Sequence, residues 1–461
     1  MNRTAIEETY KSRIEFFRLE VVRLQKIENR LMFLRLIAFL VAVAMFFFFL
    51  GTSLPMAFIL LFIGLAFLGY LMNYNLGTIR MKLRNQYLQE INEKELLCIT
   101  GDFKSFPDGF EHFDKNHPYT SDLDIFGKAS LFQYINRTTS MPGNQLLAQW
   151  LKAPAGIGEI HNRQEAIEDL IPLLEFRQKL LAVEYHYAES ASNPETILSW
   201  ANQKPVVSNQ SYLVSFTSFM SFVIFLVIVL LFFGLSYTWL TLVILINLLI
   251  AGIYTKRVNQ IHRDVTKTVG LLQAYTNTID IIENETFHSP KLTSLQLLFK
   301  GREHGAARQL KDLSKLVNKL DYRLNFLVGI CLNILLFWDI RQSIKLEAWK
   351  DRNRDFIGFW FAAMAEFEAL SSLATAGYNN PAWIMPTVLP THFTMHGINI
   401  GHPLIPESRR VCNSLVIDGV GKIALITGSN MSGKSTFQRT CGINIVLAMT
   451  GAPVCATKFE I

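Results

Sequence analysis

A short stretch near the C-terminus carries residue types that bind phosphate groups. It consists of Gly428, Ser429, Asn430, Met431, Ser432, Gly433, Lys434, Ser435 and Thr436, and it fits the pattern G-x-x-x-x-G-K-[ST]. The glycines allow the backbone to curl, so that consecutive N–H groups point at phosphate oxygens. Lys434 supplies a compact positive charge for the terminal phosphates, and the Ser435 hydroxyl is a ligand for Mg²⁺. The stretch predicts a site for ATP together with Mg²⁺.

The elements on either side must hold this loop in place. Residues 422–427 (KIALIT) form an apolar run that predicts a buried strand, and residues 435–450 predict a helix. A strand, a glycine-rich turn and a helix in that order are the context that the motif requires, because the helix N-terminus adds partial positive charge. The alternative is a glycine-rich connector that happens to contain a lysine.

Composition separates this chain from ordinary soluble enzymes. It has 461 residues, enough for two or three domains, with 50% hydrophobic residues and a mean hydropathy of +0.23. The net charge of +6 is compatible with nucleic acid binding, but positively charged membrane flanks also account for it. The five cysteines form no C-x-x-C pair, which argues against a disulfide framework or a zinc site and favours a reducing compartment.

The apolar residues are concentrated in two long runs without any Asp, Glu, Lys or Arg. These are residues 36–79, divided by Gly51 and Pro55, and residues 205–255, divided at Gly234. The two segments of the second run are each long enough to cross a bilayer. Those of the first run, residues 36–50 and 56–72, are slightly short of the ~20 residues required, although the first can extend back to Leu31. We predict two transmembrane helical hairpins. The alternative is a set of buried core helices.

Charges at the ends of the runs predict the orientation. The turns inside both runs carry no basic residue, whereas basic residues flank both runs. The flanking residues are Arg23, Lys26, Arg30, Arg35, Arg80, Lys82, Arg84, Lys204, Lys256 and Arg257. By the positive-inside rule, both hairpins start and end in the cytoplasm. We therefore expect a multi-pass protein of the inner (cytoplasmic) membrane, with its N-terminus and nucleotide-binding part in the cytoplasm.

The remaining segments are mostly helical by pattern. Residues 1–35 predict an amphipathic cytoplasmic helix, and residues 80–120 an amphipathic helix and a linker. These two helices are expected to continue the first hairpin as an antiparallel pair. A further apolar run, residues 324–338, contains two asparagines, and we interpret it as a buried helix, because a fifth span would place the loop outside the cytoplasm. The fold class is mainly α with a C-terminal α/β phosphate-loop segment.

The residues around the loop resemble a known family. The sequence T-G-S-N-M-S-G-K-S-T, followed by Arg439 and by residues 451–456 (GAPVCA), resembles the ATPase domain of MutS-type DNA mismatch-repair proteins. Asn430 and Met431 are the distinguishing pair, and Ser429 replaces the usual Pro. Residues 401–404 (GHPL) resemble the start of that domain, with Gly where the family has Arg. The resemblance implies that Arg410, Val411 and Asn413 lie on the adenine side of ATP.

The resemblance extends through much of the chain. It assigns residues 121–204 to the start of the MutS core, residues 256–390 to its helical lever and residues 391–461 to the start of the ATPase domain. The arrangement resembles the membrane-anchored bacterial branch of MutS-related proteins. It implies DNA binding coupled to ATP and a homodimer in the full-length family form.

Two departures from the family bear on function. No Phe-x-Glu occurs, which is the wedge that mismatch-reading members insert at a mispaired base, so direct mismatch reading is not expected. The acidic second motif and the switch His, which would follow the loop, are also absent. We therefore expect a truncated chain that binds ATP, with no catalytic residue for hydrolysis of its own. A transport or signalling NTPase of the membrane and a non-functional fragment remain the alternatives.

Overall fold

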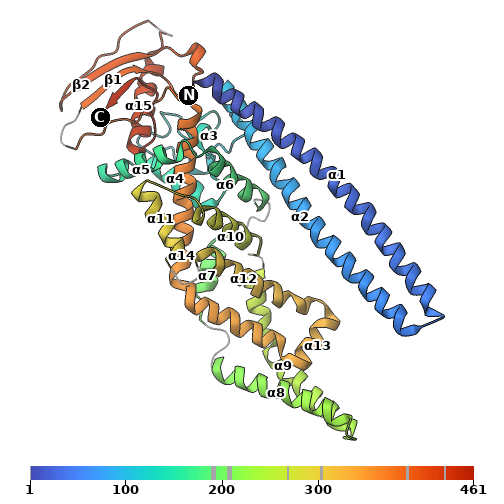
Figure 1. Cartoon of the computed structure of the whole chain (residues 1–461). Coiled ribbons are helices and arrows are strands. Elements are labelled where there is room, and N and C mark those ends of the chain that lie inside the picture. The colour runs from blue at the N-terminus through green and yellow to red at the C-terminus, as the bar shows by residue number, and fades with distance from the viewer. Residues whose placement is uncertain are drawn as a thin grey trace. The chain divides into compact units, whose positions relative to one another are not determined.

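The computed structural model describes residues 2–187, 194–204, 210–266, 269–301, 305–390, 394–429 and 432–461 (Figure 1). Helices dominate this part of the chain, which confirms the prediction of a mainly α fold. The chain divides into two compact units. The first contains Met1–Arg137, Trp150–His186 and Ser372–Ile461, and the second contains Thr138–Gln149 and Tyr187–Ser371.

The first unit begins with two long helices, α1 (Arg3–Leu50) and α2 (Leu54–Thr100). The Asn2 side chain caps α1 by accepting a hydrogen bond from Ala5 N at 2.9 Å, and Gly101 ends α2 in the left-handed conformation. Each helix is continuous across a charged and an apolar segment. The charged segment comes first in α1 and last in α2. The two pack along each other, with Lys82 of α2 paired to Glu28 of α1 at 2.6 Å (Figure 1).

The other elements of the first unit surround the end of α14 and a small sheet. They are η1 (Phe110–His112), α3 (Leu131–Ile135), α5 (Ile157–Leu170), α6 (Leu174–Tyr187), the last turns of α14 (Trp338–Asn379), β1 (Thr394–Ile400), η4 (Glu407–Arg409), β2 (Asn413–Asp418), α15 (Lys434–Thr450) and β3 (Lys458–Glu460). The described strands form one antiparallel sheet in the order β2-β1-β3. Its register shifts between Gly397 and Ile400.

The second unit is helical. It contains most of α4 (Met141–Lys152), α7 (Pro194–Asn202), α8 (Gln210–Leu231), α9 (Tyr237–Thr266), α10 (Val269–Glu283), α11 (Pro290–Lys300), α12 (Ala306–Leu320), η3 (Asp321–Leu324), α13 (Phe326–Leu336) and the longer part of α14. Helices α8 and α9 form a hairpin whose turn contains Gly234 in the left-handed conformation. The core is built on α14, where Trp349 stacks on Trp200 of α7 with ring centroids 6.3 Å apart.

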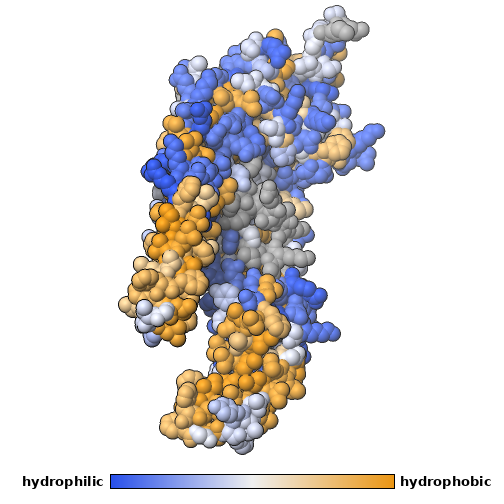
Figure 2. All heavy atoms as spheres, turned by 90° about the vertical axis from the view of Figure 1, so that its right-hand side faces the viewer, coloured by the Kyte–Doolittle hydropathy of each residue, from blue (hydrophilic) through white to orange (hydrophobic). Residues whose placement is uncertain are grey.

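Five described helices are long and apolar enough to cross a membrane by length and composition: α1, α2, α8, α9 and α14. In α14 the apolar window is 72% buried, which marks it as a core helix. In the other four the buried share is between 6% and 17%. Figure 2 shows the resulting hydrophobic surfaces over the apolar halves of α1 and α2 and over the α8–α9 hairpin. These four helices coincide with the runs from which the hairpins were predicted.

The interpretation of residues 324–338 as a buried helix is wrong. Within this run the structure forms α13, whose side chains are largely exposed, including Phe326 at 75% and Leu327 at 73%. The apolar composition indicated burial, but no described element covers this face of the helix. With 11 residues, α13 is also too short to cross a bilayer.

Candidate phosphate-binding site

The predicted helix after the loop is present as α15, which begins at Lys434. Gly433 precedes it with φ 85°, a left-handed conformation that glycine adopts without strain. The first turn closes through Phe437 N, which donates to Gly433 O at 2.8 Å. The N–H groups of Lys434, Ser435 and Thr436 therefore have no partner inside the helix. They form the partially positive helix end that a phosphate group would meet.

Lys434 lies over the loop that precedes it. Its Nζ donates to the carbonyl oxygens of Gly428 and Ser429, the latter at 2.9 Å, and Ser432 N donates to Ser429 O at 3.3 Å. The side chains of Ser435 and Thr436 are exposed, and that of Lys434 is partly exposed. Asn430 and Met431 lie outside the described residues. An ammonium group on exposed carbonyls can exchange them for phosphate oxygens, so the described residues fit a phosphate ligand.

The predicted buried strand before the loop is wrong for this structure. Residues 422–427 form no strand, and Ile423 and Leu425 are 93% and 86% exposed. A strand needs a neighbour for its backbone N–H and C=O groups. The described sheet is made of β2, β1 and β3 and does not include this run. Of the strand–loop–helix unit expected from the motif, the helix is present and the strand does not form among the described residues.

The three residues predicted on the adenine side lie at the start of β2. The Arg410 guanidinium donates to Ile405 O at 2.9 Å and to Pro403 O at 3.3 Å, and it also contacts Cys455 Sγ at 3.0 Å. In this structure it therefore holds a local turn. Val411 is 78% exposed, and Asn413 is the first residue of β2. An adenine contact by these residues stays a prediction.

Asn444 connects α15 to the turn at Gly401 and to the C-terminal segment at Cys455. Its fully buried side chain donates to Gly401 O at 3.0 Å and accepts from Cys455 N at 2.8 Å. The helix that carries Lys434 is thereby fixed to the turn containing His402 and to the C-terminal segment. Sequence reasoning missed this residue, although an amide among the apolar residues Ile443, Val446 and Leu447 was the available signal.

The turn that Asn444 holds carries a half-buried histidine. Burial and the nearby Arg410 and Arg439 guanidinium groups lower the pKa of His402 from its ordinary value. The imidazole is therefore neutral near pH 7. Its Nδ1 accepts a hydrogen bond from Leu404 N at 3.3 Å, which stabilises the turn.

The metal prediction depends on Ser435 alone. Among the described residues, no group of three or more His, Cys, Asp or Glu side chains could hold a metal ion. A magnesium ion that keeps several waters and takes phosphate oxygens needs only one or two protein ligands. The exposed Ser435 hydroxyl, next to the end of the loop, is suited to that role.

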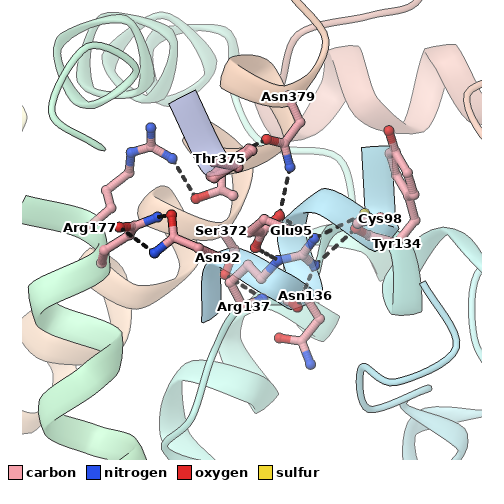
Figure 3. Close-up of polar contacts among 12 residues, drawn as sticks. Asn92, Glu95, Cys98, Tyr134, Asn136, Arg137, Arg177, Ser372, Thr375 and Asn379 are labelled. Carbon is pink, nitrogen blue, oxygen red and sulfur yellow. Dashed lines mark hydrogen bonds and ion pairs between the residues drawn. The ribbon is translucent and has the colours of Figure 1, made fainter. Parts of the chain in front are cut away.

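A buried polar network lies elsewhere in the first unit (Figure 3). Glu95 of α2 and Arg137 form an ion pair, with Arg137 Nη2 3.1 Å from Glu95 Oε2, and the same guanidinium donates to Tyr134 O and Asn136 O. Asn379, the last residue of α14, donates to Glu95 Oε2 at 2.7 Å. Burial raises the pKa of the adjacent Cys98 thiol to about 11, so this cysteine stays protonated.

The network fixes α2 to the end of α14. Arg137 N donates to Ser372 Oγ at 3.0 Å, and Arg177 of α6 donates to Thr375 Oγ1 at 2.6 Å (Figure 3). Tyr10 of α1 donates to Asn379 Oδ1 at 2.7 Å. In chain order, β1, β2 and then the loop follow α14. Sequence reasoning assigned no role to these residues, although a charge at position 95 among Ile91, Cys98 and Ile99 was visible.

Comparison with known proteins gives partial matches. No protein-family model matches the chain. It is 33% identical to the DNA mismatch repair protein MutS of Symbiobacterium thermophilum over 131 residues, which is 27% of this chain and 14% of the relative. It is 42% identical to the endonuclease MutS2 of Thermus thermophilus over 57 residues, 12% of this chain and 7% of the relative.

The chain is MutS-related over these stretches. The MutS of Leuconostoc citreum matches in the same way, with 32% identity over 102 residues, 21% of this chain and 12% of the relative. The chain thus spans about a seventh or less of the length of the curated MutS proteins that it matches.

Proposed function

We propose that this chain is a membrane-anchored, MutS-like protein that binds ATP with Mg²⁺ at residues 428–436. The observation that carries the proposal is the position of Lys434. It stands in the first turn of α15, behind the left-handed Gly433, with its ammonium group on the carbonyls of Gly428 and Ser429. The relatedness to MutS proteins supports ATP as the nucleotide.

Different residues of the loop contact the phosphate oxygens and the Mg²⁺ ion. The N–H groups of Lys434, Ser435 and Thr436 donate to phosphate oxygens, and the Lys434 ammonium exchanges a carbonyl for a phosphate oxygen. Bound ATP supplies the negative charge that gathers these donors and the Mg²⁺ ion. The Ser435 hydroxyl would be the protein ligand of that ion.

The proposal places α1, α2, α8 and α9 in the inner (cytoplasmic) membrane, with the N-terminus and the nucleotide-binding part in the cytoplasm. Two observations support it. The apolar halves of these helices expose large side chains such as Phe48 and Phe62, both 74% exposed, and basic residues flank both hairpins. These spans consist mainly of Phe, Leu, Ile and Val, which suits an anchor better than a transport pathway with polar lining residues.

We further propose DNA as a partner, with affinity that depends on bound ATP, and a homodimer as the working form of the full-length protein. The names of the relatives, DNA mismatch repair protein and endonuclease, support a DNA partner. The absence of Phe-x-Glu from the sequence favours recognition of DNA shape or backbone over reading of mismatches.

Titration of the full chain in lipid nanodiscs with a fluorescent ATP analogue and Mg²⁺ tests the nucleotide proposal. Lys434→Ala removes a charge-assisted hydrogen bond, so we expect the affinity to fall about 10- to 100-fold. Lys422→Ala, which removes another exposed lysine of the same segment, is the matched control and should leave the affinity unchanged. Failure of the unmodified protein to bind, or an equal effect of both variants, would contradict the proposal.

Binding of duplex, branched and mismatched DNA at several salt concentrations tests the DNA proposal. We expect binding that weakens steeply as salt increases, because phosphate contacts release counterions. Equal failure on all three DNA forms would refute a DNA partner and leave a membrane NTPase of another type.

A further inference from the structure

An apolar loop in the second unit is closed at its base. We call residues 324–337 the stapled loop, because the residues on its two sides hold each other. Arg323 Nε lies 3.2 Å from Asp339 Oδ2, and the Tyr322 and Trp338 rings stack with centroids 6.1 Å apart. Trp338 Nε1 also donates to Lys319 O at 2.7 Å. The chain therefore leaves and returns at nearly the same place.

The surface of the stapled loop is hydrophobic and largely exposed. Residues 324–337 contain no charged residue, and Leu324 and Phe326 are 69% and 75% exposed. Its helix, α13, is about 16 Å long at 1.5 Å per residue, against about 30 Å of hydrocarbon in a bilayer. Such a loop can enter one leaflet and return, but it cannot cross.

Both asparagine side chains of the stapled loop form hydrogen bonds with backbone groups of the loop or of its base. Asn325 Oδ1 accepts from Val328 N at 3.2 Å and caps α13. Asn333 Nδ2 donates to Gly329 O at 3.0 Å, and Asn333 Oδ1 accepts from Asp339 N at 3.0 Å. These hydrogen bonds lower the cost of placing the two asparagines away from water, because each unsatisfied polar group in hydrocarbon costs several kcal/mol.

Contacts with α8 and α9 define the depth of the loop. Asn247 Nδ2 of α9 donates to Ile334 O at 2.8 Å. At 1.5 Å per residue, Asn247 is about 14 Å along the helix axis from Lys256, the first charge that follows it. Just beyond the loop, Arg341 Nη2 donates to Thr217 O of α8 at 3.1 Å. The stapled loop thus lies beside the middle of the apolar part of α9, and Arg341, just beyond the loop, contacts α8 within its apolar segment.

We propose that the stapled loop is a re-entrant membrane element that inserts into the acyl-chain region of the cytoplasmic leaflet. The inference rests on the proposed crossing of the bilayer by α8 and α9, because whatever contacts the middle of those helices is then at membrane depth. Lipid is the occupant of its exposed face, since α13 packs beside α8 and α9 and all three helices expose large apolar side chains. The loop returns to the side from which it enters, so the C-terminal part stays in the cytoplasm.

Two exposed cysteines provide the test. Cys331 lies in the stapled loop and Cys412 in the ATPase-like segment, whereas Cys98, Cys441 and Cys455 are buried. In full-length protein in nanodiscs, Cys412→Ser leaves Cys331 as the exposed thiol, and Cys331→Ser leaves Cys412. We expect a charged, water-soluble thiol reagent to label Cys331 at least about ten-fold more slowly than Cys412, because the thiolate and the reagent are both disfavoured in hydrocarbon.

A fluorophore on Cys331 should in addition be quenched by lipids that carry a nitroxide on the acyl chain. A fluorophore on Lys315→Cys, an exposed position on α12, should not. Labelling of Cys331 as fast as Cys412, or protection without quenching by lipid, would overturn the proposal; the second result would indicate cover by protein.

Leu249→Cys on the exposed face of α9 separates this inference from the proposed membrane anchor. If Leu249→Cys is protected while Cys331 reacts quickly, the re-entrant loop is refuted and the anchor stands. If both react quickly, the proposed crossing by α9 fails, and the loop proposal fails with it.

Discussion

The first unit contains two sites in which a cation meets oxygen acceptors, and they differ in exposure. In the buried network, the Arg137 and Glu95 side chains are 4% and 3% exposed, and the pair is surrounded by further partners. At the phosphate loop, Lys434 rests on two backbone carbonyls at the protein surface. A buried ion pair is costly to break, because each charge would be left without water, whereas an exposed one exchanges partners easily. A cation on oxygen acceptors is thus rigid in the buried network, whereas at the phosphate loop it can exchange its acceptors for a ligand.

The difference in exposure also predicts different responses to substitution. The network fixes α1, α2 and α6 to the last turns of α14, and the chain then continues into β1 and the loop segment. Substitutions in the network should change the stability of the fold, and substitutions in the loop should change the affinity for nucleotide.

The largest effect is expected at the network. Arg137→Ala leaves Glu95 buried without its cation, and we expect a loss of about 3–5 kcal/mol in the free energy of unfolding. Chemical denaturation of the full chain measures it. Glu93→Ala removes an exposed carboxylate on the same helix and should change stability by less than about 0.5 kcal/mol. Similar losses of stability in the two variants would show that the buried ion pair is no more important to the fold than an exposed charge.

The next largest loss of stability is expected at Asn444. This residue is buried and lies in α15, the helix that carries Lys434 of the phosphate loop. Asn444→Ala leaves Gly401 O and Cys455 N without a partner, and the expected cost is about 1–3 kcal/mol. Faster hydrogen exchange in α15 should accompany the loss, with weaker nucleotide binding as a consequence. Unchanged exchange in α15 would show that the helix is held by its other contacts.

A smaller effect, on affinity alone, is expected at Ser435. Ser435→Ala removes the proposed protein ligand of Mg²⁺ without removing a buried contact, so the melting temperature should not change. Mg²⁺ should increase the affinity for the ATP analogue in both proteins. We expect this increase to be about ten-fold smaller in the variant than in the unmodified protein. Thr436→Ala, the adjacent exposed hydroxyl, is the control, and an equal response to Mg²⁺ in both variants would argue against a metal ligand at Ser435.

The smallest effect is a dependence on pH at His402. Its folded-state pKa is lowered from the ordinary value near 6.5 by burial and by Arg410 and Arg439, so the unfolded state binds the proton more readily. The stability contributed by neutral His402 is present above about pH 6.5 and is lost as the pH falls below that value. His402→Asn should therefore reduce the difference in melting temperature between about pH 7.5 and about pH 5.5. An unchanged difference would assign the pH dependence to other groups.

The sequence by itself determined the helical class, the four long apolar helices and the helix behind the loop. These depend on local properties: apolar period and length for the helices, and the Gly433-Lys434-Ser435 order for the start of α15. The tertiary structure decided what depends on neighbours. Residues 422–427 have the composition of a strand but no strand beside them among the described elements, and α13 has the composition of a core helix but no cover.

The buried network could not be predicted for the same reason. Glu95, Arg137 and Asn379 are far apart in the sequence, and each alone is an ordinary polar residue of a helix or a turn. Only packing of α2 and α14 against the turn that carries Arg137 removes them from water and makes each necessary to the others. Local residue types are thus sufficient to indicate a phosphate loop, whereas the support behind it arises from contacts between distant segments.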